Sequence, residues 1–117
     1  MVKGILGEFM QEQEINAEID RIVNQIIQKY KPLKIIIFGS AVRGEFDKVN
    51  DLDFLIIKEK VPLYGIERMR ELDELIDRKI AADMLVYRPH EFDERVKLKD
   101  PFITTILKEG RVVYGWF

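Results

Sequence analysis

The stretch "IIFGSAVRGEFDKVNDLDFLII", residues 36–57, decides the fold. It contains two apolar runs separated by a polar turn that carries Gly39 and Ser40. Short runs rich in β-branched residues and bounded by turn signals are typical of buried strands. We therefore predict strands at residues 34–38 and 51–57, joined by a connection that allows antiparallel pairing.

Helical patterns lie on both sides of this stretch. Apolar residues at spacings of three and four predict helices at residues 11–30 and 66–79. The Arg, Glu and Asp residues of the second helix are expected on a solvated face. A third, shorter helix is predicted at residues 101–109, with Gly110 as the residue that closes it.

Two further strands are predicted, at residues 80–87 and 111–114. Pro89 is expected to stop the first of them and to leave His90 exposed in a turn. Strands that alternate with helices indicate an α/β (α+β) domain, with a mixed β-sheet of four to five strands flanked by helices. The helix at residues 66–79 is long enough to cross over between the second and third strands.

The composition fits a single folded domain covering residues 1–117, with 47% apolar and 34% charged residues. The absence of cysteine and the single histidine exclude disulfides, thiolate metal sites and the usual zinc arrangements. A net charge of −2 argues against strong binding of duplex nucleic acid. No run has the length of a membrane-spanning helix or the layout of a secretory signal, so a cytoplasmic location is expected.

The Gly39–Ser40 turn follows a predicted buried strand. A strand that breaks into a helical turn exposes free backbone N–H groups, which suits the binding of phosphate. The alternative is that Ser40 only caps a short helix over residues 41–44. Glu45 and Phe46 stand where a P-loop needs Lys and Ser or Thr, so a Walker-type nucleotide hydrolase is not indicated.

Three aspartates form the second candidate feature. Asp51 and Asp53 are two residues apart on a predicted strand, so their side chains leave the same face. Neighbouring carboxylates repel each other, and Mg²⁺ bound together with substrate phosphates relieves that repulsion. Alternatively, both acids simply meet water at an exposed strand end. Asp83 lies in an apolar strand. If that strand neighbours the strand of Asp53, the three carboxylates together would form a two-metal phosphoryl or nucleotidyl transfer site. Alternatively, a local hydrogen-bond or ion-pair partner satisfies the Asp83 carboxylate.

The pattern "GS", ten residues, then "DLD" resembles the motif of the DNA polymerase β-like nucleotidyltransferase superfamily. Over residues 34–87 the chain is similar to the minimal nucleotidyltransferases of that superfamily. The resemblance implies a nucleotidyltransferase fold that uses ATP and two Mg²⁺ ions.

The resemblance also implies roles for individual residues. Asp51 and Asp53 would hold both ions, and Asp83 would bind the catalytic ion and help to deprotonate the attacking hydroxyl. Gly39 and Ser40 would hold the β- and γ-phosphates. Arg43 would neutralise phosphate charge, unless it is a solvated turn residue.

The activity implied by the resemblance is transfer of AMP from ATP to a hydroxyl group. The implied acceptor is a tyrosine of a HEPN-domain toxin, with this chain as the antitoxin of a toxin–antitoxin pair. Two alternatives stay open: a nucleotidyltransferase for a small molecule such as an aminoglycoside, and a non-catalytic antitoxin that binds its partner. The aromatic residues Tyr114, Trp116 and Phe117 would pack on the core or contact a partner.

Overall fold

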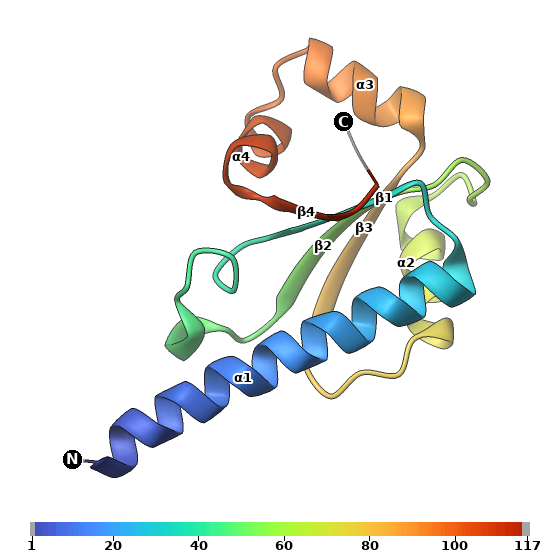
Figure 1. The fold of residues 1–117 in the computed structure, drawn as a ribbon. Helices are drawn as coiled ribbons and strands as arrows, with labels where there is room; N and C mark the ends of the chain where they lie inside the picture. The colour runs from blue at the N-terminus through green and yellow to red at the C-terminus, as the bar shows by residue number, and fades with distance from the viewer. Residues whose placement is uncertain (1, 116–117) are drawn as a thin grey trace.

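A four-stranded mixed sheet forms the centre of the protein (Figure 1). The structure is a computed structural model that describes residues 2–115, with side chains described from Gln11 onward; Trp116 and Phe117 of the predicted aromatic tail lie outside the described residues. The strands are β1 (Lys34–Phe38), β2 (Leu52–Ile57), β3 (Ala82–Tyr87) and β4 (Arg111–Tyr114), in the order β3-β2-β1-β4. β1 is antiparallel to β2 and to β4, whereas β2 and β3 are parallel. The predicted mixed α/β sheet is confirmed.

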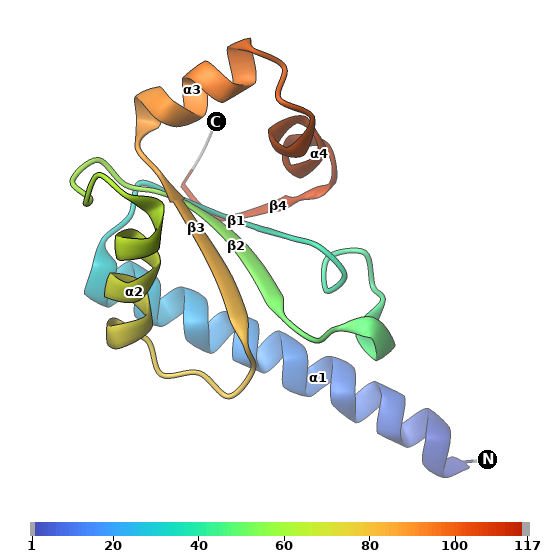
Figure 2. The same cartoon turned by 180° about the vertical axis from the view of Figure 1, so that it is seen from behind.

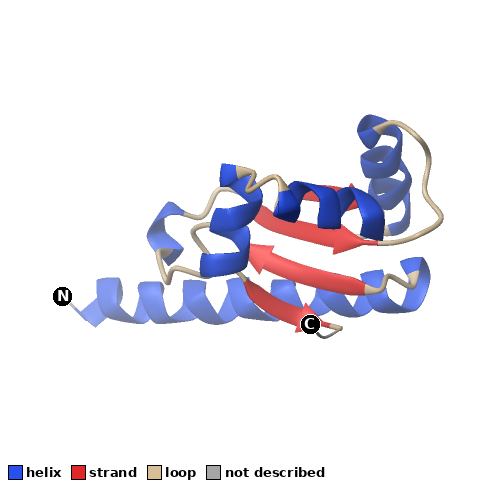
Figure 3. Ribbon diagram, turned by 90° about the horizontal axis from the view of Figure 1, so that it is seen from above, coloured by secondary structure: helices blue, strands red, loops and turns tan. Residues whose placement is uncertain are grey.

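Helices cover both faces of the sheet (Figures 1 and 2). One face carries α1 (Val2–Gln25) with the π-helical turn Ile26–Tyr30 that continues it, together with α2 (Gly65–Leu75). The other face carries α3 (Pro89–Lys97) and α4 (Pro101–Glu109). The N-terminal end of α1 extends beyond the sheet (Figure 3). Within residues 2–115, no helix combines the length and apolar character that crossing a membrane requires.

The strands alternate their side chains between two hydrophobic cores. Phe54 and Ile56 of β2 belong to the core beneath α1 and α2, whereas Leu55 and Ile57 belong to the core beneath α3 and α4. Because strand side chains repeat every two residues, Asp53 shares its face with Leu55. The sheet therefore presents the Asp53 side chain on the α3–α4 face.

Helix α2 differs from its prediction in length and in orientation. It ends at Leu75 instead of residue 79. Ile66 is exposed, while Leu72 and the supposedly solvated Arg68 are buried. The predicted apolar face is therefore confirmed at Leu72 and wrong at Ile66 and Arg68. The physical reason is that the buried Arg68 guanidinium needs hydrogen-bond acceptors, which it finds in the interior. These contacts orient the helix.

Helix α3 was not predicted, because Pro89 was interpreted as a stop signal. Pro89 instead occupies the first turn of α3, a position that proline favours because no intrahelical N–H is needed there. The Glu91 carboxylate accepts a hydrogen bond from the Arg88 N–H (2.7 Å) and satisfies the helix start. His90 is exposed as expected, but it lies in this helix instead of a turn.

The predicted bounds of α4 are confirmed. Asp100 caps its start by accepting hydrogen bonds from the N–H groups of Phe102 (2.9 Å) and Ile103 (3.3 Å). Gly110 follows the helix but has a φ of −73°, so it is not the left-handed closing residue that was expected. A Cβ at Gly110 would lie 2.5 Å from the Ile106 carbonyl oxygen, so close packing is what requires glycine there.

Candidate functional site

Asp53 and Asp83 are paired neighbours on the parallel strands β2 and β3. Paired residues of adjacent strands point to the same face, so both carboxylates lie on the α3–α4 side of the sheet. Asp51 immediately precedes β2 and is exposed. The sequence left the pairing of these two strands open; the structure pairs them, and this brings the three aspartates to one end of the sheet.

The three carboxylates interact electrostatically. Burial raises the pKa of Asp53 above its ordinary value, and the negative charges of Asp83 and Asp51 raise it further. The guanidinium of Arg43 acts in the opposite direction. A proton leaves Asp53 less readily here than in water, and a cation bound beside it would relieve the repulsion among the three carboxylates.

Gly39, the first residue of the turn, lies close to the carboxylate of Asp53. Phe38, the last residue of β1, pairs with Asp53 across the antiparallel ladder, and Gly39 follows with a φ of 86°. A Cβ atom at position 39 would overlap the Asp53 Oδ2 atom. Glycine is therefore required at position 39 for two reasons: the backbone has a left-handed conformation, and a Cβ atom would overlap Asp53.

The turn after Gly39 is a single helical turn. The N–H groups of Val42 and Arg43 donate to the Gly39 carbonyl oxygen (3.2 and 3.3 Å), and the Glu45 N–H donates to that of Ser40 (3.0 Å). Within residues 2–115, the N–H groups of Ser40 and Ala41 donate no hydrogen bond. Free backbone donors at the start of a helical turn are the arrangement that binds phosphate oxygens.

Arg43 is held at the edge of this site. Its Nε donates to Glu45 Oε1 at 2.7 Å, and about half of the side chain is exposed. The hydrogen bond with Glu45 raises the pKa of Arg43, burial opposes this effect, and the negative charges of Glu45, Glu109 and Asp53 raise the pKa further. Arg43 therefore interacts electrostatically with Asp53, and its role toward phosphate stays a prediction.

The donor set suits a hard divalent cation that binds together with substrate. Among the residues that the structure describes, no three His, Cys, Asp or Glu side chains are arranged to hold a metal ion by themselves. Mg²⁺ is commonly held by one or two carboxylates, with waters and substrate phosphates as its other ligands. The oxygen atoms of Asp51, Asp53 and Asp83, next to a turn with free N–H groups, fit that mode.

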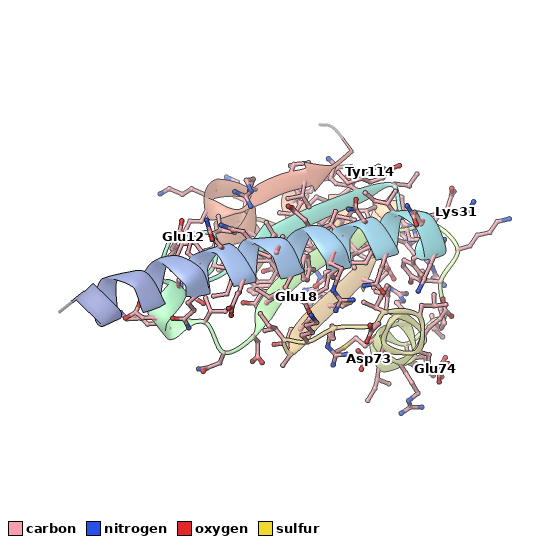
Figure 4. All side chains as sticks on the ribbon, turned by 60° about the horizontal axis from the view of Figure 1, so that its bottom comes forward. Glu12, Glu18, Lys31, Asp73, Glu74 and Tyr114 are labelled. Atoms are coloured by element: carbon pink, nitrogen blue, oxygen red, sulfur yellow. The ribbon has the colours of Figure 1, made fainter. Side chains whose placement is uncertain are left out.

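Two buried charged residues were not identified from the sequence. Arg68 is buried under the C-terminal end of β3, and Glu18 of α1 contacts the segment that enters β3. Figure 4 shows Glu18 on the side of α1 that faces this segment. For Glu18 a signal existed, because a carboxylate interrupts the apolar stripe that includes Ile15, Ile19 and Ile22.

The chain is similar in sequence to known proteins. Residues 20–115 match the family "Polymerase beta, Nucleotidyltransferase". The chain is 31% identical over 98 residues to the candidate protein adenylyltransferase MJ0604 of Methanocaldococcus jannaschii, covering 82% of this chain and 94% of that protein. It is 27% identical over 110 residues to the candidate protein adenylyltransferase MJ1305 of the same organism, covering 90% and 75%.

A solved structure shares the fold. The crystal structure of a candidate nucleotidyltransferase from Sulfolobus solfataricus superposes with a TM-score of 0.63. The likeness covers 92% of this chain and 86% of that one, at 18% sequence identity.

Proposed function

Since the chain belongs to the polymerase beta nucleotidyltransferase family, we propose that it transfers AMP from ATP to a hydroxyl group of a protein. Two relatives that cover most of the chain are described as candidate protein adenylyltransferases, which supports a protein acceptor. The observation that carries the proposal is the juxtaposition of Asp53 with Asp83 on one side and Gly39 on the other. In this proposal the backbone turn binds phosphate and the carboxylates bind the cation, and their closeness in the structure supports it.

The residues of the site have different roles in the proposed reaction. The turn at Gly39 and Ser40 binds the β- and γ-phosphates through its backbone N–H groups, and Arg43 neutralises part of their charge. Asp51, Asp53 and Asp83 would hold two Mg²⁺ ions together with the substrate phosphates. When bound, these ions supply neutralisation of phosphate charge and activation of the acceptor hydroxyl.

The bond changes balance without a further reactant. The acceptor oxygen forms a bond to the α-phosphorus while the bond from that phosphorus to the oxygen bridging to the β-phosphate breaks. The proton of the hydroxyl passes to the Asp83 carboxylate, and pyrophosphate leaves. The chain contributes orientation of the reacting groups and fixed charges in place of covalent chemistry.

The acceptor in this proposal is a tyrosine of a HEPN-type toxin, and the chain acts as its antitoxin. Residues 2–115 are taken up by the sheet and the helices that cover it, so they form no separate lobe to enclose a small acceptor. The end of the sheet that carries Asp51 and Asp83 is exposed, which a protein surface can reach.

The test is transfer of label from α-labelled ATP to the toxin in the presence of Mg²⁺. Wild-type protein should label the toxin, and replacement of the acceptor tyrosine by Phe should abolish labelling. The combined variant Asp51→Ala with Asp53→Ala should lose activity, whereas Asp20→Ala, an exposed acid on α1 across the sheet, should retain it. No labelling by wild-type protein, or labelling that survives loss of both aspartates, would refute the proposal.

A further inference from the structure

One side of α1 and of the π-helical turn Ile26–Tyr30 that continues it carries a row of polar side chains that bind the segment between α2 and β3. Its members, spaced three, four and four residues apart, are Glu18, Arg21, Gln25 and Lys29. At the far end, Lys29 Nζ donates to the Leu75 carbonyl oxygen (3.3 Å). In the middle, Gln25 donates to the Asp77 carbonyl oxygen (2.7 Å) and accepts from the Asp77 N–H (2.8 Å). The row follows the segment from the end of α2 toward β3.

Glu18 is the buried member of this row, with 5% of its surface exposed. Its carboxylate accepts hydrogen bonds from the backbone N–H groups of Lys79 and Ile80 and from Arg21 Nε (2.9 Å). Burial acts to raise the pKa of Glu18, but the hydrogen bonds from Arg21, Lys79 and Ile80 outweigh burial and hold the pKa below its ordinary value. Glu18 is thus a charged acceptor aimed at two consecutive backbone donors.

These two donors lie at the entrance to β3. The next residue, Ala81, accepts a hydrogen bond from the Leu52 N–H (2.9 Å), and the register then pairs Asp83 with Asp53. β2 and β3 are parallel and are joined through α2, so no tight hairpin turn sets their register. A slip of one residue would move Asp83 to the opposite face of the sheet.

We propose that Glu18 is a positioning residue that holds the chain at Lys79 and Ile80, and thereby places Asp83 opposite Asp53. This inference rests on the proposed function insofar as Asp83 is a ligand of the catalytic ion. It assigns to α1, on the opposite face of the sheet, a part in building the carboxylate site.

Three variants separate positioning from ordinary stabilisation. Glu18→Ala removes the acceptor for both backbone N–H groups. Glu18→Gln keeps a carbonyl oxygen that can accept from them, so it should restore function. Arg21→Met is the matched control, because it removes the ion pairs of Arg21 with Glu18 and Asp77 and leaves the contacts of Glu18 with the two backbone N–H groups in place. Glu18→Asp, which keeps the charge but shortens the reach, replaces Glu18→Ala if that variant fails to fold.

The measurements are amide hydrogen exchange at residues 79–83, Mn²⁺ affinity without nucleotide, and the kcat and KM of AMP transfer, all well below the Tm of each variant. Glu18→Ala should increase exchange at residues 79–83 and weaken Mn²⁺ binding about tenfold, as Asp83→Ala should. Its kcat should fall about 10- to 100-fold, the scale of a misplaced catalytic group, while KM for ATP stays within about twofold. Arg21→Met should lower the Tm and leave Mn²⁺ affinity and kcat near wild-type values.

Two results would overturn the inference. One is wild-type exchange at residues 79–83 with unchanged Mn²⁺ affinity in Glu18→Ala; the other is an equal loss of Mn²⁺ affinity or kcat in Glu18→Ala and Arg21→Met. If wild-type protein transfers no AMP, the proposed function fails, and the exchange and Mn²⁺ measurements still decide whether Glu18 positions Asp83.

Discussion

Gly39 lies directly against the Asp53 carboxylate, with no room between them for a side chain at position 39. This contact joins the end of β1 to the start of β2 and explains why the turn and the carboxylates occupy one site. Gly44, five residues later in the same turn, has a similar φ of 77° but open space around it. The two glycines therefore separate the effect of backbone strain from the effect of contact with Asp53.

Replacing Gly39 by Ala should abolish activity. Gly44→Ala is the control, and it should cost about 1–2 kcal/mol of stability from backbone strain alone. Gly39→Ala adds displacement of Asp53 to the same strain, so its AMP transfer should fall about 100-fold or more. Urea denaturation and kinetics on both variants test this. Equal activity losses in the two variants would show that the contact with Asp53 has no functional effect.

Asp53 should destabilise the protein at neutral pH when no divalent cation is present. Its folded-state pKa is raised by burial and by Asp83 and Asp51, so its contribution to stability is fully present below the unfolded pKa of about 3.9. That contribution is lost as the pH rises through the folded pKa. Asp53→Asn cannot ionise, so in EDTA it should have a higher Tm than wild type at pH 7 and a similar Tm at pH 3.

The matched control for Asp53→Asn is Asp20→Asn, on the exposed surface of α1. Asp20→Asn should show no gain in Tm that grows between pH 3 and pH 7. A Tm for Asp53→Asn at or below the wild-type value at pH 7 in EDTA would contradict the electrostatic interpretation of the cluster.

Adding Mg²⁺ should offset the loss of folding stability that the clustered carboxylates cause. A ligand that binds the folded state alone stabilises it by about 2.7 kcal/mol at a concentration 100 times its Kd. Mg²⁺ should therefore raise the Tm of wild-type protein, and EDTA should remove the gain. Asp53→Asn should lose most of this response and Asp20→Asn should keep it; an equal Mg²⁺ response in all three proteins would argue against a cation site at Asp53.

The strands of the sheet could be predicted because their signals are local and strong. The β-branched run at residues 34–38 and the apolar residues that surround Asp83 leave few alternatives to strands. Which strand lies beside which is not a local signal, so the pairing of Asp83 with Asp53 could be stated only as a condition. Helix α3 was missed because proline both stops and starts helices, and only the contacts beyond it decide which. The roles of Glu18 and Arg68 depend on partners more than 15 residues away, so spacing along the chain does not show them.

Arg68, which is buried, and Glu91, which is partly exposed, form the ion pair that joins α2 to the start of α3. The guanidinium donates to both Glu91 oxygens (2.7 and 3.1 Å) and to the carbonyl oxygens of Val86 (2.9 Å) and Pro62 (2.6 Å). Because Arg68 is only 3% exposed, Glu91→Gln leaves a buried charge without its counter-ion. That change should cost about 3–5 kcal/mol at pH 7, measured by urea denaturation.

The same ion pair should make wild-type stability sensitive to acid. The hydrogen bond from Arg68 lowers the pKa of Glu91 to about 2 from its ordinary value of 4.5, despite the opposing effect of burial. A lowered folded-state pKa gives stability that is present above the unfolded pKa and is lost as the pH falls toward 2. The stability difference between wild type and Glu91→Gln should therefore shrink between pH 4.5 and pH 2. The control Glu94→Gln, at an exposed position on the same helix, should have the stability of wild type at each pH. If the stability difference between wild type and Glu91→Gln persists at pH 2, the charge of Glu91 is not what the fold requires.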